Sequence, residues 1–219
     1  MSFTTRDYQA RVNAIFNQEV LKVDGMNGPQ TRKWIDNAMK SKKVSKQEDI
    51  FHDSRLHGII WHWTASRYEV TQDDLKHYNN VHDYQGNSYD GVARAEHQAN
   101  YNWRRGIGVS HTKNANTGRI GQAVSAMHGA VGWPTLNWGN FPLTWAGIDA
   151  MLQRSAEYCK EFDIPISRWS TLSHAEVERT LGIEQENKWD FMVLPGMPKV
   201  GDAIEVGDIL RDRLREKFL

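Results

Sequence analysis

Apolar residues recur at helical spacing near the start of the chain and again after a short turn. Tyr8, Val12, Ile15 and Phe16 lie on one helical face, which predicts a helix over residues 5–19. Asp-Gly and Gly-Pro pairs then mark a turn over residues 23–31. The inward positions of a second helix are Thr31, Trp34, Ile35 and Ala38. We therefore expect a small helical module over residues 1–40.

From residue 55 onward, strand-like and helix-like patterns alternate. Short apolar runs predict strands at Gly58–Trp63, Gly106–Thr112 and Gly118–Met127. Helical spacing predicts helices at Thr71–Tyr78, Leu143–Phe162 and Ile204–Phe218. This mixture indicates an α/β domain over residues 55–219, built on a central mixed β-sheet flanked by helices. The Lys-rich, polar residues 41–54 are expected to link it to the helical module.

The charge balance bears on the partners of the protein. Lys and Arg together number 27, and so do Asp and Glu. A chain without net charge lacks the basic field that recruits nucleic acid or an anionic membrane, so we expect neither partner, and we expect a monomer. Nine Trp, seven Tyr and seven Phe suit either the filling of a core or stacking against sugar rings.

The number of cysteines and the length of the apolar runs indicate in which cellular compartment the protein is made. Cys159 is the single cysteine, which excludes an internal disulfide and a Cys-rich zinc site. No stretch approaches 18 apolar residues, and the first residues lack the apolar core of a signal peptide. We therefore expect synthesis in the cytosol and, if the protein acts outside, export by another route.

Two segments far apart in the sequence offer the chemistry of a metal site. His62 ends the buried run Ile-Ile-Trp-His-Trp-Thr-Ala, and His174 stands in Ser-His-Ala-Glu. Asp190 and Lys188 follow in Lys-Trp-Asp. Two imidazoles and one carboxylate are a typical ligand set of catalytic zinc, which leaves the fourth position open for water. If these segments meet in space, the chain is a zinc hydrolase.

The same segments resemble the motifs of a known enzyme family. The strand ending in His62, the Ser-His174-Ala-Glu-Val segment and Lys188-Trp-Asp190 are similar to the ligand motifs of type 2 N-acetylmuramoyl-L-alanine amidases. A central block from Val109-Ser110-His111-Thr112 to Arg119-Ile120-Gly121 also resembles that family, which includes bacteriophage endolysins. Residues 23–31 before the second helix resemble the D-G-x-x-G-P-x-T repeat of peptidoglycan-binding modules.

This resemblance implies a fold and a set of roles. It implies the amidase fold, with Zn²⁺ bound by His62, His174 and Asp190, and with Lys188 and Tyr78 as catalytic residues. The residues expected to contact the substrate are His111, Trp63 and Asn116. The chain departs from the family in two places. Gln122 and Ala123 stand where some members have a Glu, and the separation of His174 from Lys188 implies an inserted loop at Gly182–Asn187.

The implied reaction is hydrolysis of the amide between N-acetylmuramic acid and L-alanine, with peptidoglycan as the partner. A phage or prophage endolysin fits this reading, acting on the cell wall in the periplasm or outside. Two alternatives stay open. One is a non-catalytic peptidoglycan-recognition protein on the same fold. The other is a zinc peptidase that cuts within the stem peptide through a site near His77 and His82.

Overall fold

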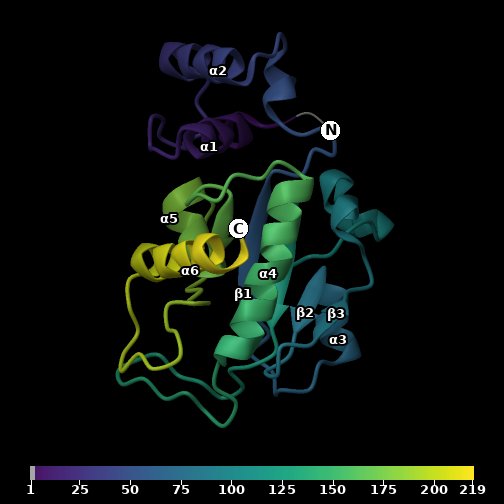
Figure 1. Cartoon of the computed structure of the whole chain (residues 1–219), viewed down its shortest axis with the longest axis vertical. Helices are drawn as coiled ribbons and strands as arrows, with labels where there is room; N and C mark the ends of the chain where they lie inside the picture. The colour runs from purple at the N-terminus through teal and green to yellow at the C-terminus, as the bar shows by residue number, and fades with distance from the viewer. Residues whose placement is uncertain (1–2) are drawn as a thin grey trace.

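The computed structural model describes residues 3–219, and its centre is a five-stranded mixed sheet in the order β3-β2-β4-β1-β5. The strands are β1 (Gly58–Trp63), β2 (Asn80–His82), β3 (Ser88–Asp90), β4 (Arg119–Val124) and β5 (Thr171–Ser173). β1 pairs in parallel with both β4 and β5, β2 pairs in parallel with β4, and β2 and β3 form an antiparallel hairpin. Helices cover the sheet, so the expected α/β fold with a mixed sheet is confirmed (Figure 1).

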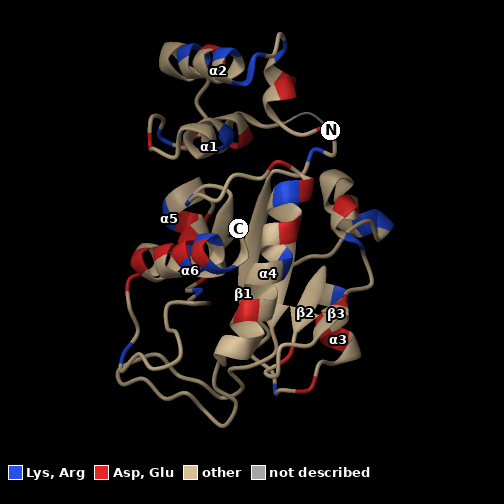
Figure 2. Cartoon of the chain, viewed as in Figure 1, with Lys and Arg blue, Asp and Glu red and all other residues tan. Residues whose placement is uncertain are grey.

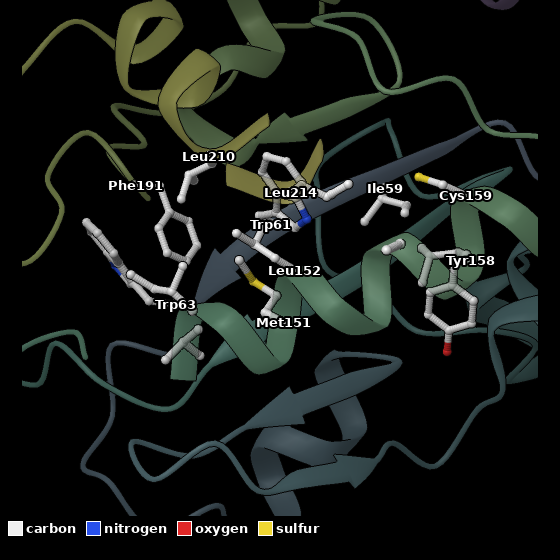
Figure 3. Packing of buried hydrophobic residues seen from close by; sticks show 14 of the residues in the cluster. Ile59, Trp61, Trp63, Met151, Leu152, Tyr158, Cys159, Phe191, Leu210 and Leu214 are labelled. Carbon is white, nitrogen blue, oxygen red and sulfur yellow. The ribbon is translucent and has the colours of Figure 1, made fainter. Parts of the chain in front are cut away.

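One face of the sheet carries the main core. β1 sends Ile59, Trp61 and Trp63 into this face, because alternate residues of a strand point the same way. Helices α4 (Trp145–Glu161) and α6 (Ala203–Phe218) cover these side chains, as Figure 3 shows. Thr144 accepts a hydrogen bond from the Gly147 N–H and so caps the start of α4.

The opposite face of the sheet is covered by the N-terminal helix and by a short helix that follows β5. Ile60 and Leu172 on this face pack against Ala10 of α1 (Thr5–Phe16) and Leu181 of α5 (Val177–Leu181). His62, two residues after Ile60, shares this face. The N-terminal helix therefore belongs to the layer on the same face as His62, but it packs near the start of β1 rather than near its end.

The N-terminal residues form a helical pair at the end of the sheet where β1 begins (Figure 1). α1 is capped by a Thr4–Asp7 capping box and ends at Phe16, earlier than expected, because Asn17 adopts a left-handed conformation. α2 (Pro29–Lys42) packs against it through a second small core, which Ile50 and Phe51 join. The first two residues of the module expected over 1–40 lie outside the described residues. The boundaries 1–40, 41–54 and 55–219 stay a prediction.

Buried polar contacts also tie α1 to the sheet domain. Arg11 donates to the carbonyl oxygen and the carboxylate of Asp163, each at 2.8 Å. Asp7 accepts from the guanidinium of Arg119 at 3.0 Å and lies 3.3 Å from the ring nitrogen of His57. Both Arg11 and Arg119 are buried. The helical pair is thus fastened to the sheet by charge pairs as well as by apolar packing.

The remaining elements are short. They are η1 (Gln47–Ile50), α3 (Gln72–His77), η2 (Ala95–Asn100), η3 (Trp103–Arg105) and η4 (His174–Glu176). The prediction of a strand at Gly106–Thr112 is wrong, because this segment is irregular and contains a turn. Gly106 and Gly108 both have positive φ there, which breaks an extended run.

Charges of both signs are interspersed over the surface helices α4 and α6 (Figure 2). Among residues 3–219, no helix has the length and apolarity needed to span a membrane.

Candidate metal site

His62, His174 and Asp190 converge on one point, although they come from three separate parts of the chain. One ligand atom from each lies within 4.8 Å of the other two, and all three residues are buried. β1 and β5 are adjacent, with Trp61 opposite Ser173, so each strand delivers its histidine to the same place. Asp190 is held there by the backbone N–H of Trp63, which donates to its Oδ1 at 3.3 Å. No other such group of His, Cys, Asp or Glu occurs in the described part of the chain.

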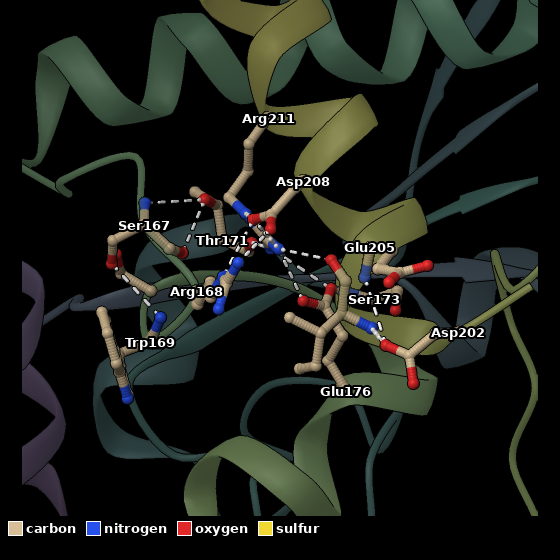
Figure 4. Close-up of polar contacts among 12 residues, drawn as sticks. Ser167, Arg168, Trp169, Thr171, Ser173, Glu176, Asp202, Glu205, Asp208 and Arg211 are labelled. Atoms are coloured by element: carbon tan, nitrogen blue, oxygen red, sulfur yellow. Dashed lines mark hydrogen bonds and ion pairs between the residues drawn. The ribbon is translucent and has the colours of Figure 1, made fainter. Parts of the chain in front are cut away.

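The turn that carries His174 is fixed by a buried ion pair. Glu176 accepts a hydrogen bond from the Ser173 N–H at 2.7 Å and pairs with the guanidinium of Arg211, also at 2.7 Å. Arg211 comes from α6 and also donates to the carbonyl of Thr171 in β5 at 2.8 Å (Figure 4). The C-terminal helix therefore braces both the strand and the turn that position the second histidine.

One nitrogen of His62 is already engaged on the side away from the cluster. Its Nε2 lies 3.1 Å from His111 Nδ1 and 3.3 Å from the hydroxyl of Thr112. His111 donates through its own Nε2 to the carbonyl of Arg119 at 3.1 Å, so its Nδ1 is an acceptor, and this Nδ1 also lies 2.9 Å from the hydroxyl of Thr112. Because Nε2 of His62 has these neighbours, its Nδ1 is the nitrogen left to bind a metal ion.

Burial keeps the two histidines neutral, as metal ligands must be. Desolvation lowers the pKa of His62 well below its usual value, and the neighbouring His174, His111 and Lys188 lower it further. Desolvation also lowers the pKa of His174, although Asp190 opposes the change. His174 Nδ1 lies 3.6 Å from Asp190 Oδ2. Two neutral imidazoles and one carboxylate fit a divalent ion and leave a fourth position open.

Tyr78 and Lys188 lie beside this cluster. The ring of Tyr78 is 5.2 Å from that of His62, measured between centroids. Burial raises the pKa of the Tyr78 phenol above its usual value, with Asp190 adding to the rise, so the phenol stays protonated at neutral pH. Lys188 lines a groove together with His174. The structure thus brings together all five residues expected to bind the metal or act in catalysis.

The groove beside the cluster has a volume of about 440 Å³. Its lining includes His174, which is one of the three candidate metal ligands, together with polar and charged side chains. The lining residues are Tyr101, Ser110, His111, Thr112, Lys113, Asn114, Asn116, His174, Gln185, Glu186 and Lys188. The groove is open to solvent on one side of the metal cluster. A polymer with amide and hydroxyl groups therefore has room to approach the metal cluster at His174, the one ligand that lines the groove.

The three residues expected to contact the substrate have different positions. His111 and Asn116 line the groove, and Asn116 Oδ1 accepts from the backbone N–H groups of His111 and Thr112, each at 2.9 Å. Trp63 does not line it. The indole of Trp63 is 5% exposed and packs in the core against Trp189, on the opposite side of the strand from His62.

The structure does not assemble the alternative site near His77 and His82. His82 is fully buried and bonds Ser88 and Gln122, whereas the side chain of His77 is 53% exposed. Gln122 also donates to Ser155 at 2.7 Å, in the core rather than toward the metal cluster. The residues that sequence reasoning missed are Gln185, Glu176 and Arg211. Gln185 carries no pattern of its own, but Arg211 is a charged residue on the otherwise apolar face of α6, which is a usable signal.

Comparisons with known proteins add little to this geometry. No protein-family model and no curated protein matches the sequence. Among solved structures, the chain is similar to the N-acetylmuramoyl-L-alanine amidase LysC from Clostridium intestinale URNW, at 13% identity and a TM-score of 0.42. That alignment covers 73% of this chain and 89% of the other. Because both values are low, the functional argument stands on the residues of the site.

Proposed function

We propose that this protein is a zinc-dependent peptidoglycan hydrolase that cleaves the amide between N-acetylmuramic acid and L-alanine. The observation that carries the proposal is the convergence of His62, His174 and Asp190, with Tyr78 beside His62 and with Lys188 and His174 lining one groove. These are the residues that the resemblance to type 2 amidases singled out from sequence. Their convergence supports that resemblance, because nothing in their spacing along the chain forces them together.

The ligand set favours zinc over other common ions. Magnesium and calcium prefer sites made of oxygen atoms alone, whereas two imidazole nitrogens and one carboxylate are a frequent set for zinc. When bound here, the ion would supply Lewis acidity that polarises a carbonyl and lowers the pKa of water. The residues of the chain would then hold the scissile amide and stabilise the charge that develops on it.

Lys188 and Tyr78 supply that stabilisation. The ammonium of Lys188 lines the groove next to His174, so it would face the carbonyl oxygen as negative charge develops there. The protonated phenol of Tyr78, beside His62, would donate a hydrogen bond to the same group. The departing L-alanine amine takes its proton from solvent or through Tyr78.

The biological role proposed is host lysis by a phage or prophage endolysin, with peptidoglycan as the substrate. The helical pair α1 and α2 is proposed to belong to this function as a wall-binding module. Its Asp24-Gly25 and Gly28-Pro29 turn supports the assignment, since that turn carries the resemblance to peptidoglycan-binding repeats.

The test is hydrolysis of purified peptidoglycan by the zinc-loaded protein and by two alanine variants. His174→Ala removes a metal ligand and should reduce the release of soluble wall fragments to the level of a chelated control. His77→Ala is the matched control, because the side chain of His77 is exposed and is not part of the ligand cluster, and it should keep wild-type activity. Activity that survives in His174→Ala and disappears in His77→Ala would move the site to the stem-peptide peptidase alternative.

A further inference from the structure

The segment between α5 and Lys188 has one buried side chain. Gly182, Glu184, Glu186 and Asn187 are exposed, whereas Gln185 is 6% exposed. A polar side chain is buried at little cost only when its donors and acceptors are all bonded. The partners of Gln185 therefore explain why an otherwise exposed loop folds inward at this residue.

The amide group of Gln185 has a defined orientation. Its Nε2 donates to the backbone carbonyls of Lys113 at 3.0 Å and Ile183 at 3.3 Å. Carbonyl oxygens accept and cannot donate, so the amide nitrogen must face them. The amide oxygen of Gln185 consequently faces the other way, where it lies 2.9 Å from Nε2 of His174.

That orientation determines where His174 carries its proton. An amide oxygen only accepts, so Nε2 of His174 must carry the hydrogen in this contact. A neutral imidazole has a single N–H, which leaves Nδ1 with a lone pair. Nδ1 is the nitrogen that lies toward Asp190, at 3.6 Å from its carboxylate. Gln185 therefore favours the tautomer of His174 that has its proton on Nε2 and a free lone pair on Nδ1, which is the tautomer that can bind a metal through Nδ1.

We propose that Gln185 is a positioning residue that holds His174 in the tautomer whose Nδ1 binds the metal. Segment 182–187, which the sequence marks as an inserted loop, is the part of the chain that builds it into the site. This inference rests on the metal cluster of the proposed function, but it does not depend on the substrate. Partners that orient a metal-bound histidine commonly raise metal affinity by about 10- to 100-fold.

A purely structural role is the competing explanation. Gln185 also joins two loops through Lys113, and the exposed ammonium of Lys113 pairs with Glu186 at 2.7 Å. Loss of these contacts could loosen the groove without any effect on the tautomer of His174. Variants that separate the acceptor of Gln185 from its donors distinguish the two roles.

The first measurement is zinc affinity of the full chain, by competition with a chromophoric chelator. Gln185→Met keeps the length but loses the acceptor, and we expect its zinc affinity to fall by about 10- to 100-fold. Gln185→Glu keeps an acceptor but loses the donors to Lys113 and Ile183, and should bind zinc at least as tightly as wild type. Glu186→Gln breaks only the exposed ion pair and should change affinity less than about twofold.

The second measurement reads the tautomer directly, by long-range ¹H–¹⁵N correlation NMR of the metal-free protein labelled at histidine. His174 should carry its proton on Nε2 in wild type and in Gln185→Glu, and a mixture of tautomers should appear in Gln185→Met. A proton on Nδ1 in wild type, unchanged zinc affinity in Gln185→Met, or an equal loss in both Gln185 variants would overturn the proposal. None of these readouts uses peptidoglycan, so the amidase proposal can fail or hold independently.

Discussion

Replacing Arg211 with Met should destabilise the protein severely, because it leaves a buried carboxylate without its counter-charge. The side chains of Arg211 and Glu176 are 1% and 0% exposed, and they pair at 2.7 Å. In Arg211→Met, Glu176 keeps the backbone N–H of Ser173 as a partner but loses the guanidinium. Burial already raises the pKa of Glu176, and Arg211 opposes that rise. The variant therefore carries an anion in a place where water cannot reach it.

The expected cost is about 3–5 kcal/mol at pH 7, the range for breaking a buried ion pair from one side. A domain of this size is stable by only about 5–15 kcal/mol, so the loss is a large share of the total. The deficit depends on pH in a defined direction. Without Arg211 the pKa of Glu176 rises further, so protonation relieves the penalty as pH falls, and the deficit relative to wild type shrinks below pH 7.

The assay is urea denaturation followed by circular dichroism at pH 7 and pH 5. Two further variants calibrate it. Glu176→Gln/Arg211→Met removes both charges and should be more stable than Arg211→Met alone at pH 7. Arg215→Met makes the same substitution on the same helix, but Arg215 and its partner Asp212 are exposed, so it should cost less than about 1 kcal/mol. A loss under about 1 kcal/mol in Arg211→Met, or a deficit that grows as pH falls, would refute the reasoning.

Three further outcomes are expected. Asp7→Asn should destabilise by about 1–3 kcal/mol at pH 7 in urea denaturation, and the loss should begin to shrink only as pH falls below the unfolded pKa of about 3.9. Although burial opposes it, His57 and Arg119 hold the pKa of Asp7 below its usual range, so this stability is present above the unfolded pKa and is lost as pH falls. Lys188→Met should lower kcat on peptidoglycan by about 10²–10³-fold while the zinc Kd stays unchanged, and an equal loss in zinc binding would contradict its assigned role. Zinc at 100 times its Kd should stabilise the wild type by about 2.7 kcal/mol, and His62→Ala should show no such gain.

The metal cluster could be predicted from sequence because one of its ligands, His62, is a polar residue in an otherwise apolar strand. Gly58–Trp63 is apolar except for His62, as expected for a parallel strand buried on both faces. A charged or polar residue in such a run needs a partner. The order of His62, His174 and Asp190 along the chain also resembles the ligand motifs of the type 2 amidases, and the structure brings the three residues together.

Trp63 shows where the sequence argument stopped short. The sequence offers it as one of several tryptophans suited to contact the substrate, yet neighbouring residues of a strand point to opposite faces. The same alternation that directs His62 to the metal cluster sends the Trp63 indole into the core. Strand periodicity was enough to place this residue correctly.

Gln185 could not be predicted from sequence. It lies in a polar stretch without periodicity, and its partners Lys113 and His174 are brought close only by the folded loops. Contacts between irregular segments depend on the path of the whole chain, which local patterns do not encode. The packing of α1 against Ile60 and Leu172 is a similar case, because the sequence shows the helix but not which surface it covers.

The most direct test of the account is mass spectrometry of the products released from purified peptidoglycan by the zinc-loaded protein, beside a chelated control. The account predicts free stem peptides that begin with L-alanine, together with glycan strands that retain intact muramic acid, and only when zinc is present. Fragments cut within the stem peptide, or binding to peptidoglycan without any cleavage by the folded, zinc-loaded protein, would contradict it.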